Sequence, residues 1–254
     1  MSYNDSMKVS PLIKYLCFEL YTASLLAPLI YKKNDPDILH RFRVALRQSR
    51  SLIILYMPEQ YAFSDTLKSI LQQSNQLREL DVFLQEEELL GYPNLHYEIK
   101  QYRKTVLKKQ ATQKNIKHIC SALNLMYEEL LASKMELDRQ HLVAKAQASY
   151  TLNIKHYRAI NKKTTQDQLH HIRIGFKVTR YALEFLTQTG MKNEGKKIQK
   201  CKEKQDHLGK VQDIANQILW AKHFCKQHQL KECKMLIKSF KQRLQYLKKS
   251  ARAL

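Results

Sequence analysis

The sequence has little glycine and proline for its length. Only 5 Gly and 5 Pro occur in 254 residues, and no proline follows Pro93. This shortage excludes collagen-like and low-complexity chains, and it argues against β-sandwiches, whose many tight turns need these residues. Because proline interrupts helices, the chain beyond Pro93 can form long helices without a break.

Acidic residues are also scarce. The chain has 23 Asp and Glu against 44 Lys and Arg, which gives a formal net charge of +21. Such a charge repels itself in a compact fold and predicts a polyanionic partner: nucleic acid, another phosphate polymer or an acidic membrane surface. Solubility alone is the other interpretation, but it needs far less net charge.

Cysteine pairs and long apolar runs are missing as well. The 5 cysteines contain no C-x-x-C pair, and their odd number and wide spacing predict reduced thiols in a cytoplasmic protein. His223, Cys225, His228 and Cys233 lack the paired spacing of a zinc site, so we expect no metal and no cofactor. The N-terminal residues do not resemble a secretory signal, and the longest apolar run, residues 52–57, is too short to span a membrane.

Apolar residues recur at helical spacing along almost the whole chain, whereas the alternation typical of strands is absent. We therefore predict an all-α fold of about eight helices arranged in bundles. The expected helices cover about residues 10–31, 36–58, 61–90, 95–131, 134–160, 166–190, 192–228 and the remaining C-terminal stretch. Helix starts are indicated by Asp35-Pro36-Asp37 and by the overlapping capping-box spacings at 164–168.

One segment of the chain occurs twice. Residues 39–53, LHRFRVALRQSRSLI, align without gaps to residues 169–183, LHHIRIGFKVTRYAL. Farther along, QLRELDVFL at 76–84 resembles KVQDIANQI at 210–218. The repeat predicts two pseudo-equivalent halves, 1–133 and 134–254, related by a near two-fold axis.

Both copies of the repeated segment carry basic residues at the same four positions. On a helix, their spacing places the side chains within about a quarter of the surface, in a stripe about 15 Å long. The opposite side of each segment is mostly apolar, which predicts that it packs in the core. The two stripes consist of His40, Arg43, Arg47 and Arg50, and of His170, Arg173, Lys177 and Arg180.

A row of guanidinium groups suits a linear chain of phosphates, because each group can bind two phosphate oxygens at once. The other interpretation is a solvated basic face, which usually has acidic partners three or four residues away. No acid lies between Leu39 and Glu59, or between Gln168 and Tyr181. The missing partners favour an anion-binding role for the stripes.

At these residues the sequence resembles the CHAD family, the conserved histidine α-helical domain. The family's signature helix reads approximately L-H-x-x-R-[VI]-A-[LT]-[RK]-[RK]-x-R-x-x-L and occurs twice per domain, as it does here at 39–53 and 169–183. An L-G-x-x-[RN]-D-like stretch follows each copy, and residues 207–213 match it well, whereas 78–82 match it less closely. The resemblance extends over nearly the whole chain.

Several positions depart from the family pattern. Gln48 and Val178 replace the second basic residue of each copy, Gly175 replaces an alanine and Thr179 replaces an apolar residue. Ser74-Asn75 stands where Leu-Gly is usual. Both four-residue stripes nevertheless remain intact.

The resemblance implies one stand-alone domain of two pseudo-two-fold-related four-helix bundles around a basic central cleft or pore. That site is implied to bind inorganic polyphosphate, or phosphate and sulfate ions, without catalysis. The implied ligands are the eight residues of the two stripes together with Arg78 and Lys210. We expect a cytoplasmic protein, and association with polyphosphate granules is one option.

Two other functions compete with polyphosphate binding. A protein of this charge binds DNA or RNA non-specifically at low salt, but no recognised nucleic-acid module is visible. An enzyme acting on phosphate compounds would need a nucleophile or a metal site, and none of G-x-x-x-x-G-K-[ST], G-x-S-x-G and H-E-x-x-H occurs. We therefore expect a binding protein rather than an enzyme.

Overall fold

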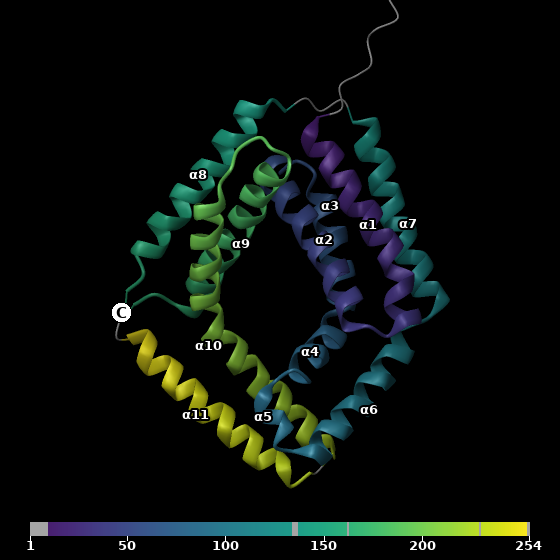
Figure 1. Cartoon of the computed structure of the whole chain (residues 1–254), viewed down its shortest axis with the longest axis vertical. Helices are drawn as coiled ribbons and strands as arrows, with labels where there is room; N and C mark the ends of the chain where they lie inside the picture. Colours follow the sequence, from purple (N-terminus) through teal and green to yellow (C-terminus); the bar gives the residue numbers. More distant parts are fainter. Residues whose placement is uncertain (1–9, 134–136, 162, 229, 253–254) are drawn as a thin grey trace, which may run out of the picture. The chain divides into compact units, whose positions relative to one another are not determined.

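The chain is helical throughout the part that the structure describes. The structure is a computed structural model that describes residues 10–133, 137–161, 163–228 and 230–252, with side chains through residue 247. These residues form eleven helices and no strand (Figure 1), which confirms the predicted all-α class. The helices are α1 (Pro11–Lys33), α2 (Pro36–Tyr56), α3 (Tyr61–Gln73), α4 (Asn75–Phe83), α5 (Glu87–Leu90), α6 (Pro93–Gln110), α7 (Gln113–Ala132), α8 (Arg139–Arg158), α9 (Gln166–Gln188), α10 (Gly195–His228) and α11 (Glu232–Arg252).

Two of the predicted helices are divided in the structure, so the expected number of about eight is wrong. The stretch 61–90 forms α3, α4 and α5, and the stretch 95–131 forms α6 and α7. At the second division, Ala111 leaves helical geometry and the Thr112 hydroxyl accepts a hydrogen bond from the Asn115 N–H at 3.2 Å. Neither glycine nor proline marks this break, so only the N-cap character of Thr112 could have predicted it.

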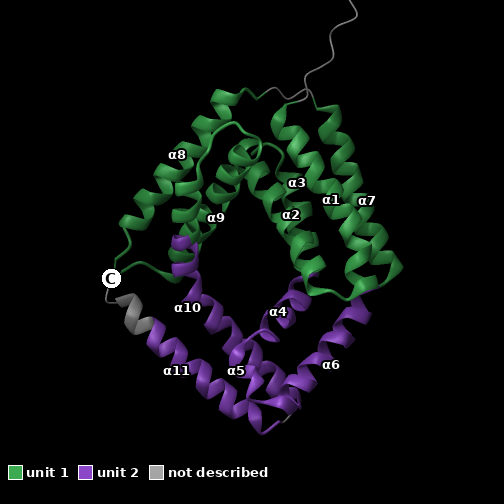
Figure 2. Ribbon diagram, in the orientation of Figure 1, with its two compact units in different colours: residues 1–73, 112–202 green, residues 74–111, 203–254 purple. Residues whose placement is uncertain are grey.

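The helices form two compact units, which Figure 2 shows in green and purple. Unit 1 consists of residues 1–73 and 112–202, and unit 2 of residues 74–111 and 203–254. Each unit therefore combines residues from both predicted halves, 1–133 and 134–254. The near two-fold relation between those halves stays a prediction.

In unit 1, α2 packs against α1, α3, α8 and α9. Both sequence signals for helix starts are confirmed: Asp35 accepts a hydrogen bond from the Asp37 N–H at the start of α2, and Thr165 with Gln168 forms a capping box at the start of α9. The apolar side of α2 is buried, as the repeat predicted, with core positions at Phe42, Ala45, Leu46, Ser49 and Ile53.

Within the described residues, α1 is the helix whose length and composition would also fit a membrane-spanning segment. One such helix is weak evidence, because the core helices of many proteins pass the same test. In unit 1, α1 packs against α2 and α7, and it buries one side that includes Leu12, Leu16, Leu20 and Ala27. This packing is that of a core helix.

The contact between α8 and α9 is close at Gly175. A Cβ atom at Gly175 would lie 2.0 Å from Asn153 Oδ1, so a larger residue does not fit without movement. The buried Asn153 donates from Nδ2 to Ser149 O and to Thr179 Oγ1, both at 2.9 Å. Gly175 and Thr179, which both depart from the family pattern, therefore take part in one polar contact between the two helices.

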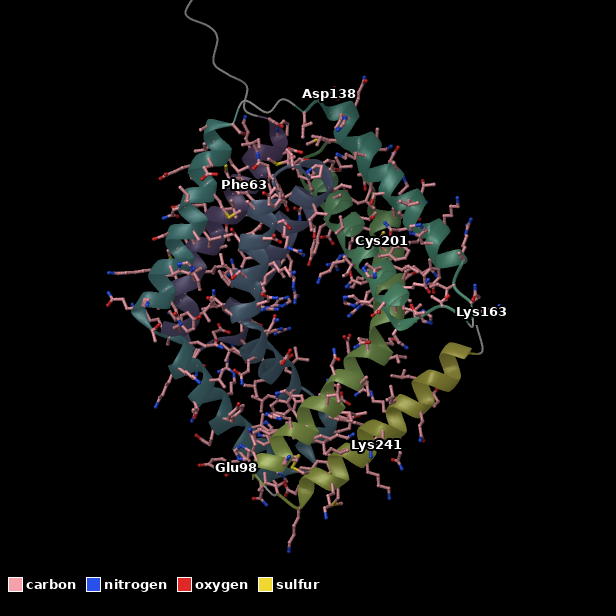
Figure 3. The ribbon with its side chains drawn as sticks, turned by 180° about the vertical axis from the view of Figure 1, so that it is seen from behind. Phe63, Glu98, Asp138, Lys163, Cys201 and Lys241 are labelled. Atoms are coloured by element: carbon pink, nitrogen blue, oxygen red, sulfur yellow. A yellow bond between two sulfur atoms is a disulfide. The ribbon has the colours of Figure 1, made fainter. Side chains whose placement is uncertain are left out.

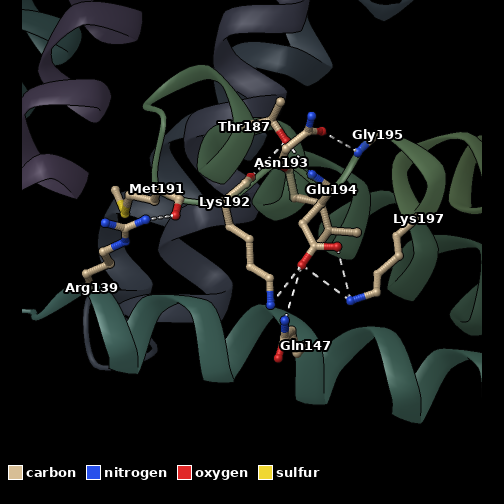
Figure 4. Close-up of polar contacts among 10 residues, drawn as sticks. Arg139, Gln147, Thr187, Met191, Lys192, Asn193, Glu194, Gly195 and Lys197 are labelled. Atoms are coloured by element: carbon tan, nitrogen blue, oxygen red, sulfur yellow. Dashed lines mark hydrogen bonds and ion pairs between the residues drawn. The ribbon is translucent and has the colours of Figure 1, made fainter.

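A buried carboxylate fixes the connection between α9 and α10 to α8 (Figure 4). Glu194 Oε1 accepts hydrogen bonds from Gln147 Nε2 at 3.2 Å and from Lys197 Nζ at 3.3 Å. The carboxylate also forms ion pairs with Lys197 Nζ at 3.0 Å and with Lys192 Nζ at 3.4 Å. Burial raises the pKa of Glu194, but the hydrogen bonds from Gln147 and Lys197 outweigh this effect and the pKa lies below its usual value. Glu194 therefore stays ionised and holds the connection at neutral pH.

Unit 2 contains an aromatic core and a disulfide. The Phe83 ring on α4 lies 4.5 Å from Trp220 and 5.7 Å from Phe240, measured between ring centroids. A disulfide joins Cys225 near the end of α10 to Cys233 at the start of α11, where the turn brings their Cα atoms to 5.7 Å. The expectation of reduced thiols is therefore wrong for this pair, and the free cysteines are Cys17, Cys120 and Cys201.

We expect Gly175→Ala to destabilise the protein, although alanine is favoured over glycine inside a helix by about 1 kcal/mol. The new methyl group would displace the Asn153 side chain and cost its two hydrogen bonds, at roughly 1 kcal/mol each. Urea unfolding should therefore show a net loss of about 1 kcal/mol.

Asn153→Ala supplies the control, because it removes the atom that the new methyl group would meet. In that background, Gly175→Ala is expected to stabilise the protein through its helix propensity. The same loss of stability in both backgrounds would contradict the assigned contact.

Candidate anion-binding site

The two basic stripes lie on neighbouring helices of unit 1. The first stripe is on α2 and the second is on α9, and these helices pack against each other (Figures 1 and 3). Both helices bury their apolar side, and of the basic positions Arg43 is buried, whereas Arg47, Arg173, Lys177 and Arg180 are half-buried. The structure therefore brings residues of both copies of the repeat together.

The positive charges of four arginines act on the ammonium group of Lys177 on α9. These belong to Arg47 and Arg43 of α2 and to Arg173 and Arg180 of α9. Burial, followed by the repulsion from these charges, lowers the pKa of Lys177 to about 7. Arg47, which exerts the largest of the four charge effects, occupies the same position of the repeat as Lys177. We call these five residues the cation cluster.

Two arginines of the first stripe also bind the backbone of α3. Arg43 donates from Nη1 to Leu71 O at 2.7 Å, and Arg50 donates from Nε to Ser64 O at 3.1 Å. Arg43 is only 4% exposed, whereas Arg50 is half-buried. Sequence spacing could not reveal these contacts, because the acceptors are carbonyl groups that every residue carries. Arg43 therefore contributes to the cluster mainly through its charge and through its hydrogen bond to the backbone of α3.

The two histidines stand at the N-terminal ends of the stripes, and both are exposed. The His170 ring packs edge-on against His171, with ring centroids 6.3 Å apart, and His171 Nδ1 lies 2.7 Å from Asp167 O. His40 and His170 are therefore accessible to a ligand that extends along the helices beyond the arginines.

One carboxylate lies beside the cation cluster. Glu184 Oε1 is 3.6 Å from Arg180 Nε, one helical turn away on α9. Burial raises the pKa of Glu184, and the opposing effects of Arg180 and of a hydrogen bond with Gln48 do not fully offset it. The Arg180 guanidinium also lies 4.6 Å from the centre of the Tyr181 ring.

Sequence reasoning missed the roles of Glu184 and Gln48. The four-residue spacing between Arg180 and Glu184 was an available signal for the ion pair. The sequence pattern marks Gln48 only as the loss of a basic residue. In the structure, its side chain forms a hydrogen bond with the Glu184 carboxyl group. These residues orient Arg180 at the edge of the cluster.

The remaining two predicted ligands belong to unit 2. Arg78 is half-buried on α4, and Lys210 is exposed on α10. Burial and the charges of Lys204 and Lys210 lower the pKa of His207, so these three side chains form a local basic group on α10. Participation of Arg78 and Lys210 in the site stays a prediction.

The cation cluster has the chemistry of an oxyanion site. Guanidinium and ammonium groups donate charge-assisted hydrogen bonds to phosphate or sulfate oxygens, and a bound anion would relieve their mutual repulsion. Among the residues that the structure describes, no three His, Cys, Asp or Glu side chains gather in a way that could hold a metal ion.

Comparisons with known proteins place these features in a family context. The family model described as CHAD domain matches residues 20–222, which include both copies of the repeat. A solved structure, the crystal structure of the CHAD domain from the plant Ricinus communis, is similar with a TM-score of 0.70 and 17% sequence identity. The match covers 96% of this chain and 93% of that chain, and at this identity it shows a shared fold. No curated protein matches the sequence.

We expect Lys177→Met to raise the thermal stability of the protein at pH 6, because it removes a half-buried charge that four arginines repel. In the unfolded chain the lysine keeps its proton up to a pKa of about 10.4, whereas the folded protein releases it near neutral pH. Wild-type stability therefore rises between about pH 7 and pH 10, and the advantage of the variant shrinks over that range. Thermal unfolding at graded pH measures this.

Arg103→Met is the matched control for the loss of a buried cation. Arg103 Nε donates to Asp81 Oδ1 in unit 2, and both side chains are buried. Its removal leaves a buried carboxylate without this guanidinium and should lower stability. If both variants were less stable than wild type at pH 6, the assigned repulsion at Lys177 would be contradicted.

Proposed function

We propose, from the premise that the chain belongs to the CHAD domain family, that it binds inorganic polyphosphate at the cation cluster. The observation that carries this proposal is that four arginines, two on α2 and two on α9, act on the charge of Lys177, and that these two helices pack against each other. The repulsion between these positive charges destabilises the free protein, and bound phosphate oxygens would reduce this repulsion. The proposed role is binding without catalysis, in the cytoplasm and with polyphosphate granules as one location.

A linear polymer suits the site better than a compact ion. Each stripe extends over about 15 Å along its helix, so its four basic positions follow one another in a row. The exposed histidines would lengthen the row beyond the arginines. Successive phosphates of one chain could then pair with successive cations, and the binding free energies would add.

We expect the triple variant Arg47→Gln, Arg173→Gln, Arg180→Gln to lose more than about 100-fold in affinity for long-chain polyphosphate at about 0.15 M salt. The variant makes fewer phosphate contacts and therefore releases fewer counterions when it binds. The slope of log affinity against log salt concentration should become shallower by about 2. Arg43 is kept because it also binds the α3 backbone. Titration at several salt concentrations measures both effects.

The control removes the same charge from exposed lysines of unit 1, in the triple variant Lys68→Gln, Lys114→Gln, Lys117→Gln. Its affinity should fall only a few-fold, because these side chains contribute general attraction alone. Circular dichroism verifies that both variants keep their helicity. Equal losses in the two variants would refute a specific site at the cation cluster.

The affinity should also rise with the length of the phosphate chain until the polymer spans the stripes. Orthophosphate and pyrophosphate can contact only part of a row of about 15 Å, so they should bind weakly. A titration with polymers of graded length tests this expectation. Equal affinity for pyrophosphate and for long chains would instead indicate a compact anion site.

Non-specific nucleic-acid binding is the second candidate, and the net charge of +21 favours it. Competition separates the two functions at about 0.15 M salt. If the proposal is right, long-chain polyphosphate displaces a labelled RNA, whereas unlabelled RNA does not displace polyphosphate. The reverse order of displacement would assign the site to nucleic acid.

A further inference from the structure

We propose that the outer side of α1 docks on the surface of a membrane that contains anionic phospholipids. The docking surface is a stripe of exposed apolar side chains with a lysine at each end, and we call it the α1 face. Its members are Lys14, Phe18, Tyr21, Leu25, Pro28 and Lys32. The cation cluster lies on other helices, α2 and α9, so this proposal goes beyond polyphosphate binding. The helix would lie on the bilayer and would not cross it.

The exposed side of α1 is as apolar as its buried side. The composition of α1 would fit a membrane span, yet only 44% of that stretch is buried inside the protein. Phe18 is 64% exposed, Tyr21 54% and Leu25 53%. A helix that is apolar all round is normally covered all round, and a contiguous exposed apolar patch marks an interaction site for a protein or a membrane.

The exposed positions form one continuous stripe. They follow one another at steps of four and three residues from Lys14 to Lys32, which keeps them on one side of the helix over about 27 Å. The neighbouring helix α7 widens the apolar area (Figure 1), because the Tyr127 ring centroid lies 6.5 Å from that of Tyr21. Leu131, one turn farther along α7, is exposed on the same side as Tyr127.

The charges of the α1 face favour an anionic partner. Lys14 and Lys32 are both exposed, and a lysine stem can lie along an apolar surface while its ammonium group reaches the phosphate of a lipid headgroup. The carboxyl group between them in the sequence, that of Glu19, is half-buried and hydrogen-bonded with Tyr15. The stripe therefore has two positive ends and an apolar middle.

The same charges argue against a second copy of this chain as the occupant. An antiparallel pair of α1 helices would place Lys14 opposite the Lys32 position of the other copy, and a parallel pair would place each lysine opposite its equivalent. Like charges would meet in either arrangement, and each copy has a net charge of +21. An anionic bilayer instead offers phosphates to both lysines and acyl chains to the side chains between them.

Phe18→Trp tests whether the α1 face enters the bilayer, because the natural Trp220 lies in unit 2. With vesicles of equal parts phosphatidylcholine and phosphatidylglycerol at about 0.15 M salt, we expect the emission of the new tryptophan to shift to the blue. Brominated acyl chains in these vesicles should quench it. Leu125→Trp is the control, since Leu125 is exposed on α7 but two residues from Tyr127 and so on the other side of that helix. No quenching at position 18, or equal quenching at both positions, would overturn the proposal.

Vesicle sedimentation separates the apolar contribution from general attraction between charges. We expect the double variant Phe18→Ser, Leu25→Ser, which keeps every charge, to bind the mixed vesicles about 30-fold more weakly than wild type. The control Leu125→Ser, Leu152→Ser changes two exposed leucines of α7 and α8 and should bind as wild type. Equal losses in the two variants would contradict docking through the α1 face.

The headgroup charge is tested with pure phosphatidylcholine vesicles, which wild type should bind at least about 10-fold more weakly than the mixed vesicles. Equal affinity for both kinds of vesicle would overturn the role of Lys14 and Lys32. Failure of wild type to bind the mixed vesicles would overturn the proposal and leave an acidic protein surface as the occupant.

Sedimentation equilibrium without lipid tests the remaining occupant. We expect the wild-type protein and the variant Phe18→Ser, Leu25→Ser to have the same oligomeric state. A wild-type dimer that dissociates in this variant would assign the α1 face to a second copy of the chain and overturn the proposal.

Discussion

The repulsion that four arginines exert on the Lys177 ammonium group is the interaction on which the proposed site depends. The packing of α2 against α9 brings the two helices that carry these charges together, because each helix buries its apolar side. Burial of apolar surface stabilises the folded state by about 25 cal/mol per Å². A well-packed core can therefore offset the unfavourable free energy of several positive charges that lie close together. The fold thus holds the cations near one another before any anion is present.

The surroundings of the cluster limit how far these side chains can relax. Arg43 is tied to a carbonyl group of α3, and Arg180 is held between the Tyr181 ring and Glu184. Restricting long side chains in advance reduces the conformational entropy that a ligand would otherwise have to remove. An arginine that already has a fixed direction is therefore a better partner for phosphate than one that is mobile in solvent.

Much of the fold class and the position of the stripes could be predicted from sequence, because both depend on short-range periodicity. The basic residues of 39–53 and 169–183 share a spacing that places them on one side of a helix whatever the rest of the chain does. The break at Ala111 was missed because no glycine or proline marks it. The partner of Arg43 was missed because a backbone carbonyl has no signature in sequence.

Other features were beyond sequence reasoning because they join distant residues. The contact of Gly175 with Asn153 depends on how closely α8 approaches α9. The bond between Cys225 and Cys233 depends on the turn between α10 and α11. The sequence pattern marks Gly175 as a departure from the family and predicts unpaired thiols for the cysteines. The packing of the helices explains both features.

The interleaving of the two compact units has a consequence for biosynthesis. Unit 1 needs residues 112–202 as well as 1–73, so residues 1–133 do not contain a complete packing unit when they leave the ribosome. The buried apolar sides of α1 and α2 are fully covered only after α7 and α9 have been synthesised. Since translation adds about 5–20 residues per second, these early helices spend several seconds as an unfinished intermediate that chaperones can bind.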